Sequence, residues 1–313
     1  MADPQVKALL DELSASGRPS SMRLPLPEGR RNFTELFVSL SRTTQVHAVE
    51  DAVLPGPAGD IPARLYRPAP EGPLPVAVYC HGGGWVFGGL EACDGLCRSL
   101  AVASGALVVA PAYRLAPEHP YPAALEDCYA VTEWVHRHAL ELGADAGRSA
   151  VVGESSGGNL AAGVALLARD RGIPSIGFQL LMYPALDPSL ASPSYRENAE
   201  DPFLSRAEME WYWDRYLGRR GGRIEPYAAP VLAAALRGLP PAHVITAGHD
   251  VLRDEGELYA ERLRGAGVAV SVRRYDDMVH GFMSMARYLD TAGRAVEDAG
   301  RVLAGALGAW AEA

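Results

Sequence analysis

The segment Gly153-Glu154-Ser155-Ser156-Gly157 constrains the fold of this chain more than any other feature. It follows the short apolar run 149–152 and precedes the helix-favouring segment 158–167, so we predict a strand, a sharp turn and a helix. A serine on such a turn is held in a strained conformation with its hydroxyl pointing outward, and the flanking glycines prevent a collision across the turn. The pattern predicts Ser155 as the nucleophile of an acyl transfer. The alternative is a glycine-rich turn without chemistry.

A serine nucleophile needs a base, and the base needs a carboxylate that holds its tautomer. His280 fits the first role best among the eight histidines, because it lies near the carboxyl edge of the sheet. It follows the last predicted strand, which ends near Tyr275, and a predicted turn at 276–279. Asp250 directly follows the predicted strand at 243–246 and fits the second role. Asp254 is the alternative acid, although it also fits the first turn of the following helix.

A run of three glycines provides candidates for an oxyanion hole. The segment His81-Gly82-Gly83-Gly84-Trp85 directly follows the predicted strand at 76–79. Glycines allow backbone N–H groups to approach a substrate oxygen without a Cβ atom in the way. We expect His81 to orient the loop by hydrogen bonding, and a flexible turn is the alternative for the whole segment. The expected donors are the backbone amides of Gly83, Gly84 and Ser156.

Hydrophobic patterning divides the chain into a helical start and a longer part in which strands and helices alternate. Residues 1 to about 45 are expected to form amphipathic helices, and 47–53 and 61–66 an antiparallel pair at a sheet edge. The apolar strands that follow predict an α/β fold, with a mostly parallel, twisted sheet flanked by helices. We expect these strands at 76–79, 106–109, 150–152, 177–182, 243–246 and 268–272.

The stretch between the predicted strands at 177–182 and 243–246 holds about sixty residues, more than one crossover needs. We therefore predict a helical insertion at about 186–228 that forms a cap, or lid, together with residues 1–45. The predicted domains are an N-terminal helical cap segment, 1–45, and a catalytic domain, 46–313, that carries the insertion.

Several aromatic residues are candidates for the walls of a substrate pocket. Trp85 lies beside the glycine run, Tyr183 ends the strand after the nucleophile helix, and the insertion holds Phe203, Trp211 and Trp213. A bulky lid would favour short acyl chains. The alternative is ordinary packing, because buried aromatic side chains mostly fill cores.

Charge and composition exclude several classes of partner. The net charge of −9 argues against a nucleic acid or an anionic membrane surface. No apolar run approaches the roughly 18 residues of a membrane span, and no signal peptide is recognisable, so a cytoplasmic protein is expected. Four cysteines lack metal-site spacing and are expected to be reduced thiols, with no metal bound. They are Cys80, Cys93, Cys97 and Cys128.

Five motifs occur along the chain in the order found in one family of esterases. They are His81-Gly82-Gly83-Gly84, Tyr113-Arg114-Leu115-Ala116-Pro117-Glu118, Gly153-Glu154-Ser155-Ser156-Gly157-Gly158, Asp250-Val251-Leu252-Arg253-Asp254-Glu255-Gly256 and His280-Gly281-Phe282. Over about residues 46–313 the chain resembles the hormone-sensitive-lipase-like esterases, the bacterial family IV carboxylesterases. The resemblance implies an α/β-hydrolase fold with a helical cap, no cofactor, and hydrolysis of short- to medium-chain acyl esters.

The same resemblance assigns Ser155 as nucleophile, His280 as base and Asp250 as acid, in agreement with the choices made from the residues. The expected reaction passes through an acyl-enzyme intermediate, with a small-molecule ester as partner. The sequence leaves the oligomeric state open: the last strand and the C-terminal helix could expose an edge for a homodimer, with contacts from Val302, Leu303, Leu307 and Trp310. Departures from the family pattern are Glu154 for Asp, Ser156 for Ala, Ala112 for Asp and Val251 for Pro.

Two other functions are compatible with these motifs. A deacetylase or amidase would use the same three side chains, and the sequence does not show how a leaving nitrogen would be protonated. A non-catalytic small-molecule receptor is the second alternative. Receptors that resemble this fold lack a member of the triad, whereas His280 is present here.

Overall fold

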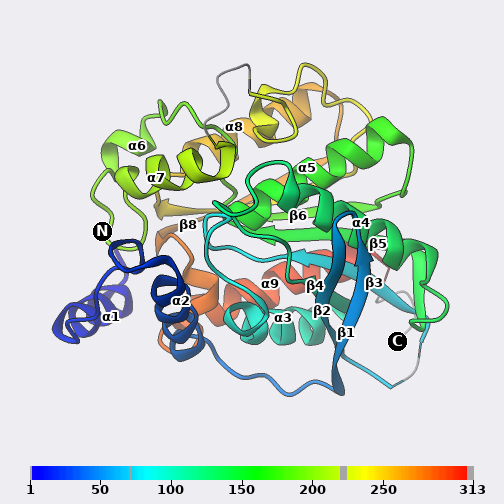
Figure 1. The fold of residues 1–313 in the computed structure, drawn as a ribbon, viewed down its shortest axis with the longest axis horizontal. Coiled ribbons are helices and arrows are strands. Elements are labelled where there is room, and N and C mark those ends of the chain that lie inside the picture. The colour runs from blue at the N-terminus through cyan, green and yellow to red at the C-terminus, as the bar shows by residue number, and fades with distance from the viewer. Residues whose placement is uncertain (1, 71, 219–223, 309–313) are drawn as a thin grey trace.

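The computed structural model of the protein describes residues 2–70, 72–218 and 224–308. Within these ranges, eight strands form one sheet in the order β1-β2-β4-β3-β5-β6-β7-β8 (Figure 1). The strands are β1 (Ala48–Gly56), β2 (Gly59–Arg67), β3 (Leu74–Cys80), β4 (Leu107–Pro111), β5 (Ala144–Glu154), β6 (Phe178–Met182), β7 (Ala242–His249) and β8 (Val270–Val279). The α-helices are α1 (Pro4–Ala15), α2 (Leu26–Leu40), α3 (Leu90–Ser104), α4 (Ala123–Arg137), α5 (Ser156–Arg171), α6 (Ser194–Glu197), α7 (Arg206–Leu217), α8 (Arg253–Gly265) and α9 (Asp290–Ala306). Short 3-10 helices are η1 (Ser21–Arg23), η2 (Pro230–Leu232) and η3 (Phe282–Met285).

The sheet is parallel except at β2, which runs antiparallel to both of its neighbours, β1 and β4. The predicted α/β class is therefore confirmed, and the predicted antiparallel pair lies at one edge of the sheet. Every residue of β3, β4 and β6 is buried, as expected for parallel strands that are covered on both faces.

Helices cover both faces of the sheet (Figure 1). Helices α3 and α9 pack against each other on one face, and α4, α5 and α8 contribute to the core on the other. Side chains of β3 alternate between the faces, because successive residues of a strand point in opposite directions. Ala77 and Tyr79 belong to the α3–α9 layer, whereas Val76 and Val78 belong to a separate cluster.

The last strand is longer than predicted. The sequence favoured a strand with its apolar run at 268–272 that ends near Tyr275, followed by a turn at 276–279, but β8 runs from Val270 to Val279. It pairs only with β7 at the edge of the sheet, so its charged side chains, including Asp276 and Asp277, remain exposed. An edge strand tolerates such residues, and the turn prediction was wrong for this reason.

Two helical segments pack on different layers of the core. Val6 and Leu9 of α1 and Leu40 of α2 are buried with the α3–α9 layer. Met209 and Trp213 of α7, which lies between β6 and β7 in the sequence, are buried with the α4–α5 layer. In Figure 1 both segments lie on the same side of the molecule as β8. These are the two segments in which the sequence predicts a cap.

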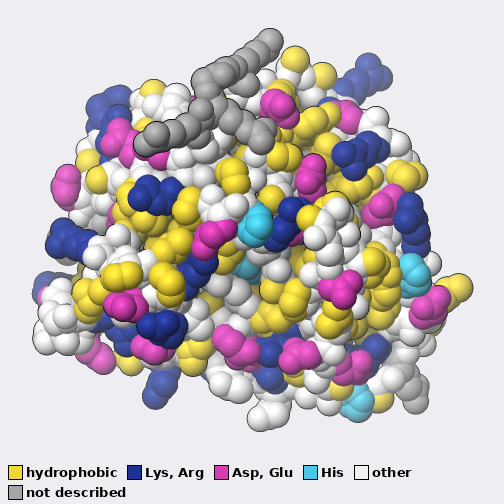
Figure 2. Space-filling view, viewed as in Figure 1, with side chains coloured by type: hydrophobic (Ala, Val, Ile, Leu, Met, Phe, Trp, Pro, Cys, Tyr) yellow, Lys and Arg dark blue, Asp and Glu magenta, His cyan; other side chains and the backbone are white. Residues whose placement is uncertain are grey.

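In the described part of the chain, no helix combines the length and the apolar character that crossing a membrane requires. Acidic and basic side chains are interspersed over the face shown in Figure 2.

Of the residues named for a dimer contact, Leu303 and Leu307 are buried inside the chain, within the α3–α9 layer. Trp310 lies outside the described residues.

Candidate active site

The nucleophile turn joins the end of β5 to the start of α5. Ser155 has φ 55° and ψ −122°, a left-handed conformation that a non-glycine residue rarely adopts. A Cβ atom on Gly153 would overlap the backbone of Gly157, and one on Gly157 would overlap the carbonyl of Cys80. The Ser155 amide donates to the carbonyl of Met182 at 2.9 Å, which ties the turn to the neighbouring strand. The glycines and this bond hold the serine in its strained position.

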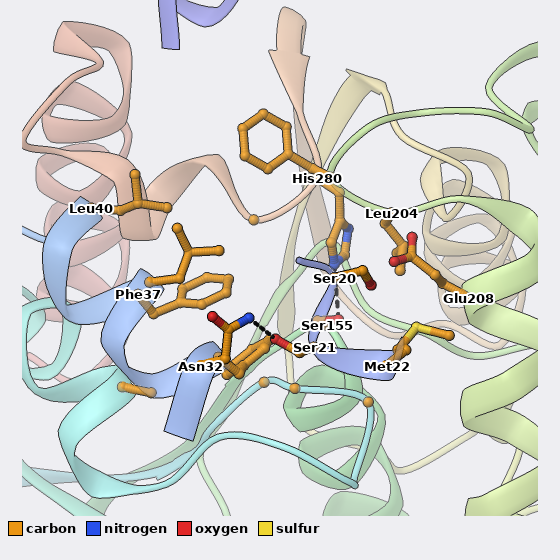
Figure 3. Close-up of a pocket in the computed structure, with 18 of the residues that line it drawn as sticks. Ser20, Ser21, Met22, Asn32, Phe37, Leu40, Ser155, Leu204, Glu208 and His280 are labelled. Carbon is orange, nitrogen blue, oxygen red and sulfur yellow. Dashed lines mark hydrogen bonds between the residues drawn. The ribbon is translucent and has the colours of Figure 1, made fainter. Parts of the chain in front are cut away.

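A hydrogen-bonded chain connects three side chains that are far apart in the sequence. His280 Nε2 lies 2.9 Å from Ser155 Oγ, and His280 Nδ1 lies 2.8 Å from Asp250 Oδ2. Figure 3 shows the imidazole of His280 pointing to Ser155, with a dashed line for their hydrogen bond. With Nδ1–H donating to the carboxylate, Nε2 is free to accept the serine proton. Asp254, the alternative acid, instead accepts from the Ser194 amide.

The carboxylate of Asp250 is fully buried and is held by the backbone. Its Oδ1 accepts from the Leu252 amide at 2.9 Å, so Oδ2 remains directed at the imidazole. Burial by itself lowers the pKa of His280, but the charge and hydrogen bond of Asp250 outweigh it. With smaller contributions from the charges of Asp201 and Glu154, the pKa of His280 is raised above its ordinary value of 6.5.

The glycine run forms a tight loop beside the nucleophile. The carbonyl of Gly83 accepts from the amides of Val86 and Phe87, at 3.2 and 2.8 Å. Gly83 and Gly84 have φ values of 114° and 61°, which favour glycine. A Cβ atom on Gly84 would overlap the ring of Tyr212. The backbone of this loop therefore packs against Tyr212 more closely than any residue with a Cβ atom would allow.

His81 holds the loop and remains neutral. It is buried, and its Nδ1 lies 2.8 Å from the carbonyl of Gly82, to which it donates. Its ring stacks on Tyr113, whose hydroxyl donates to the His81 carbonyl at 2.7 Å. Burial lowers the pKa of His81 to about 4. A neutral imidazole with these contacts fits the expected orienting role.

Glu154, next to the nucleophile, is a buried carboxylate whose partners the sequence did not indicate. Hydroxyl groups of Tyr79, Tyr183 and Ser284 donate to it at 2.9, 3.0 and 3.1 Å. The ring of Tyr183 also packs edge-on against His280. A glutamate where the family usually has an aspartate was the only sequence signal for this cluster.

Ser155, His280 and the glycine loop line a cavity of about 350 Å³. Both helical segments line it, with Phe37 and Leu40 of α2 on one side and Leu204 and Glu208 of the insertion on the other (Figure 3). Its apolar lining from the N-terminal helices comprises Leu10, Leu13, Met22, Phe33, Leu36, Phe37 and Leu40. The sequence did not single out these N-terminal residues for the pocket, although the amphipathic pattern of the segment was the available signal.

The aromatic residues expected in the pocket divide into two groups. Tyr183 and Phe203 line the cavity, whereas Trp85, Trp211 and Trp213 do not. Trp85 is fully buried and stacks on Tyr216, with ring centroids 4.2 Å apart, so it packs behind the glycine loop. Tyr212 lines the cavity in place of its two tryptophan neighbours, because these side chains leave α7 in other directions.

Among the described residues, no group of three or more His, Cys, Asp or Glu side chains is placed to hold a metal ion. Cys80, Cys93, Cys97 and Cys128 are free, buried thiols there. The chemistry that this cavity offers is that of a serine, an imidazole, a carboxylate and backbone amides.

Comparison with known proteins places these features in a family. The profile of the alpha/beta hydrolase fold matches residues 77–284. The chain belongs to this α/β-hydrolase family. The hydrolase is 45% identical over 248 residues to esterase LipI of Mycobacterium tuberculosis, with 78% of each chain covered. It is 34% identical to an ethyl acetate hydrolase of Pseudomonas putida over 93% of this chain and 94% of the relative.

Solved structures agree with this assignment. The hydrolase superposes on the ester-hydrolase EH1AB1 from the metagenome of Lake Arreo with a TM-score of 0.94 and 40% identity, covering 98% of this chain and 100% of the other. An esterase of Pyrobaculum calidifontis gives a TM-score of 0.90 at 40% identity, with 97% and 99% covered. The resemblance to hormone-sensitive-lipase-like esterases is thereby confirmed.

Proposed function

We propose that this hydrolase is a serine carboxylesterase that cleaves short- to medium-chain acyl esters through Ser155, His280 and Asp250. The hydrogen-bonded chain of these three side chains at the cavity is the observation that carries the proposal. Relatives that align with most of the chain are named esterase, carboxylesterase and ethyl acetate hydrolase, and the chain is an enzyme of the carboxylic ester hydrolase class.

The proposed reaction has two steps, acylation of Ser155 and hydrolysis of the acyl-enzyme. Ser155 Oγ attacks the ester carbonyl while His280 Nε2 takes its proton, and the amides of Gly83, Gly84 and Ser156 bind the oxyanion. When the tetrahedral intermediate collapses, His280 gives the proton to the leaving alcohol. Water then attacks the acyl-enzyme, with His280 again as base. When the bond to Ser155 Oγ breaks and the acid leaves, His280 returns the proton to Ser155. Each step uses groups of this chain and water, without a cofactor.

The apolar wall of the cavity supports a preference for acyl chains of limited length. Each buried methylene contributes about 0.8 kcal/mol, or roughly fourfold in kcat/KM, for as long as the chain adds contact with this wall. In a cavity of about 350 Å³ the gain ends once the space beside the apolar wall is filled. We therefore expect kcat/KM to rise over the first members of an acyl series and to fall for long-chain triglycerides.

A series of p-nitrophenyl esters from acetate to palmitate tests the proposal, with the Ser155→Ala variant as control. We expect turnover by the native protein, an optimum at short to medium chains, and loss of turnover in the variant, which remains folded. Near-normal rates in Ser155→Ala would refute the assignment of the nucleophile. Matched acyl anilides distinguish an esterase from an amidase, and a serine-reactive phosphonate that forms no adduct would favour a receptor.

A further inference from the structure

The oxyanion loop is fastened to the N-terminal helix α2 by one arginine. In Figure 3, α2, which carries Asn32, Phe37 and Leu40, lies beside the cyan segment of the glycine loop. Arg30 of the same helix donates from Nε to the carbonyl of Val86 at 2.9 Å. Val86 is fully buried and follows the glycines by two residues, so this bond holds the loop directly behind the expected oxyanion donors.

The same guanidinium binds a second segment of the chain. Arg30 Nη2 donates to the carbonyl of Ala116 at 3.1 Å, and the carboxylate of Glu118 accepts from Nη1 and Nη2 at 2.8 and 2.7 Å. The Ala116 amide in turn donates to the carbonyl of Trp85 at 2.9 Å. Two successive carbonyls of the loop, Trp85 and Val86, are therefore held from outside, one by backbone and the other by Arg30.

The internal geometry of the loop explains why such support matters. Gly83, Gly84 and Trp85 all have positive φ, at 114°, 61° and 60°, which is costly for the tryptophan. The carbonyl of Gly83 is bonded to the amides of Val86 and Phe87, so a shift at Val86 is transmitted to Gly83. Backbone amides stabilise an oxyanion only when they are aimed at its position before the reaction.

We propose that Arg30 is a positioning residue, through which helix α2 of the N-terminal segment holds the backbone amides of the oxyanion loop in their active arrangement. This inference rests on the proposed function. It means that the N-terminal segment contributes to the rate of the chemical step in addition to lining the cavity. Arg30 does not line the cavity itself, so its loss leaves the walls that contact substrate in place.

The experiment compares Arg30→Ala, Arg30→Lys and the matched control Arg31→Ala. Arg31 is the exposed neighbour on α2, and its side chain makes no hydrogen bond to the described residues. We expect Arg30→Ala to lower kcat by about tenfold to a hundredfold, because small displacements of catalytic groups cost up to about 10² in rate. KM should stay within about twofold, and Arg31→Ala should match the native protein.

Two further readouts separate positioning from a general loss of structure. A trifluoromethyl ketone, to which Ser155 adds reversibly, should bind Arg30→Ala more weakly in proportion to the loss of kcat/KM. Guanidinium ion, below denaturing concentrations, should restore part of the lost kcat. Lysine cannot reproduce the fork of bonds to Val86, Ala116 and Glu118, so Arg30→Lys should also lose kcat severalfold. If Arg30→Ala does not fold, Arg30→Lys decides the question.

Several results would overturn the inference. Unchanged kcat in a folded Arg30 variant would exclude a role in positioning. A rise in KM without a change in kcat would show that Arg30 only stabilises the wall of the cavity. An equal loss in Arg31→Ala would point to the helix as a whole. Native protein without ester turnover would refute the proposed function and this inference together, whereas active native protein with an equally active Arg30→Ala would refute this inference alone.

Discussion

The substitution Gly84→Ala tests the close approach of the oxyanion loop to α7. The added Cβ atom would lie closer to the Tyr212 ring than the 3.0 Å that real Cβ contacts respect, so loop and ring must move apart by about 1 Å. A left-handed alanine costs about 1–2 kcal/mol, and overpacking adds about 1–3 kcal/mol. We expect a loss of about 2–5 kcal/mol in the free energy of unfolding. A displacement of this size should lower kcat by about a hundredfold.

Urea unfolding and the kcat for p-nitrophenyl butyrate measure these effects, with Gly172→Ala as control. Gly172 has a similar φ of 74° but no atom within 4 Å of the added Cβ, so only the conformational cost of about 1–2 kcal/mol should appear, with full activity. In a Tyr212→Ala background, Gly84→Ala should cost much less in kcat, because the ring is gone. A Gly84→Ala variant with kcat within about threefold of native, or an undiminished penalty in the double variant, would contradict the reasoning.

Three predictions concern the His280–Asp250 pair. Because Nε2 must be neutral to accept the Ser155 proton, kcat/KM should fall as pH drops through the raised pKa of His280, with a midpoint above 6.5, and a midpoint below 6.5 would contradict the charge balance described here. The raised pKa of His280 also contributes to the free energy of unfolding. This contribution is fully present below pH 6.5 and is lost as pH rises through the pKa of the folded state. The free energies of unfolding of native protein and His280→Gln should therefore differ less at high pH. Asp250→Asn should lower kcat by about 10⁴ and move the acid limb of the pH–rate profile to lower pH. A pH series of single-turnover rates measures both effects. An acid limb that stays in place would exclude Asp250 as the source of the raised pKa of His280.

Local sequence patterns predicted those parts of the fold in which neighbouring residues act together. Apolar runs predicted the buried strands, because parallel strands covered on both faces contain little else. The glycines around Ser155 predicted a tight turn, and the structure shows that a side chain at Gly153 or Gly157 would overlap the backbone. The end of β8 was missed because its charged residues resemble a turn, and only the arrangement of the sheet makes that strand an edge.

The choice of Ser155, Asp250 and His280 as candidate residues came from the sequence alone, since each follows a strand at the same edge of a parallel sheet. Which side chains form the cavity was decided by the tertiary structure. The orientation of a side chain depends on what packs against its helix, so Tyr212 lines the cavity while Trp211 and Trp213 do not. The bond from Arg30 to Val86 joins residues 56 positions apart, and only the docking of α2 on the glycine loop brings them into contact.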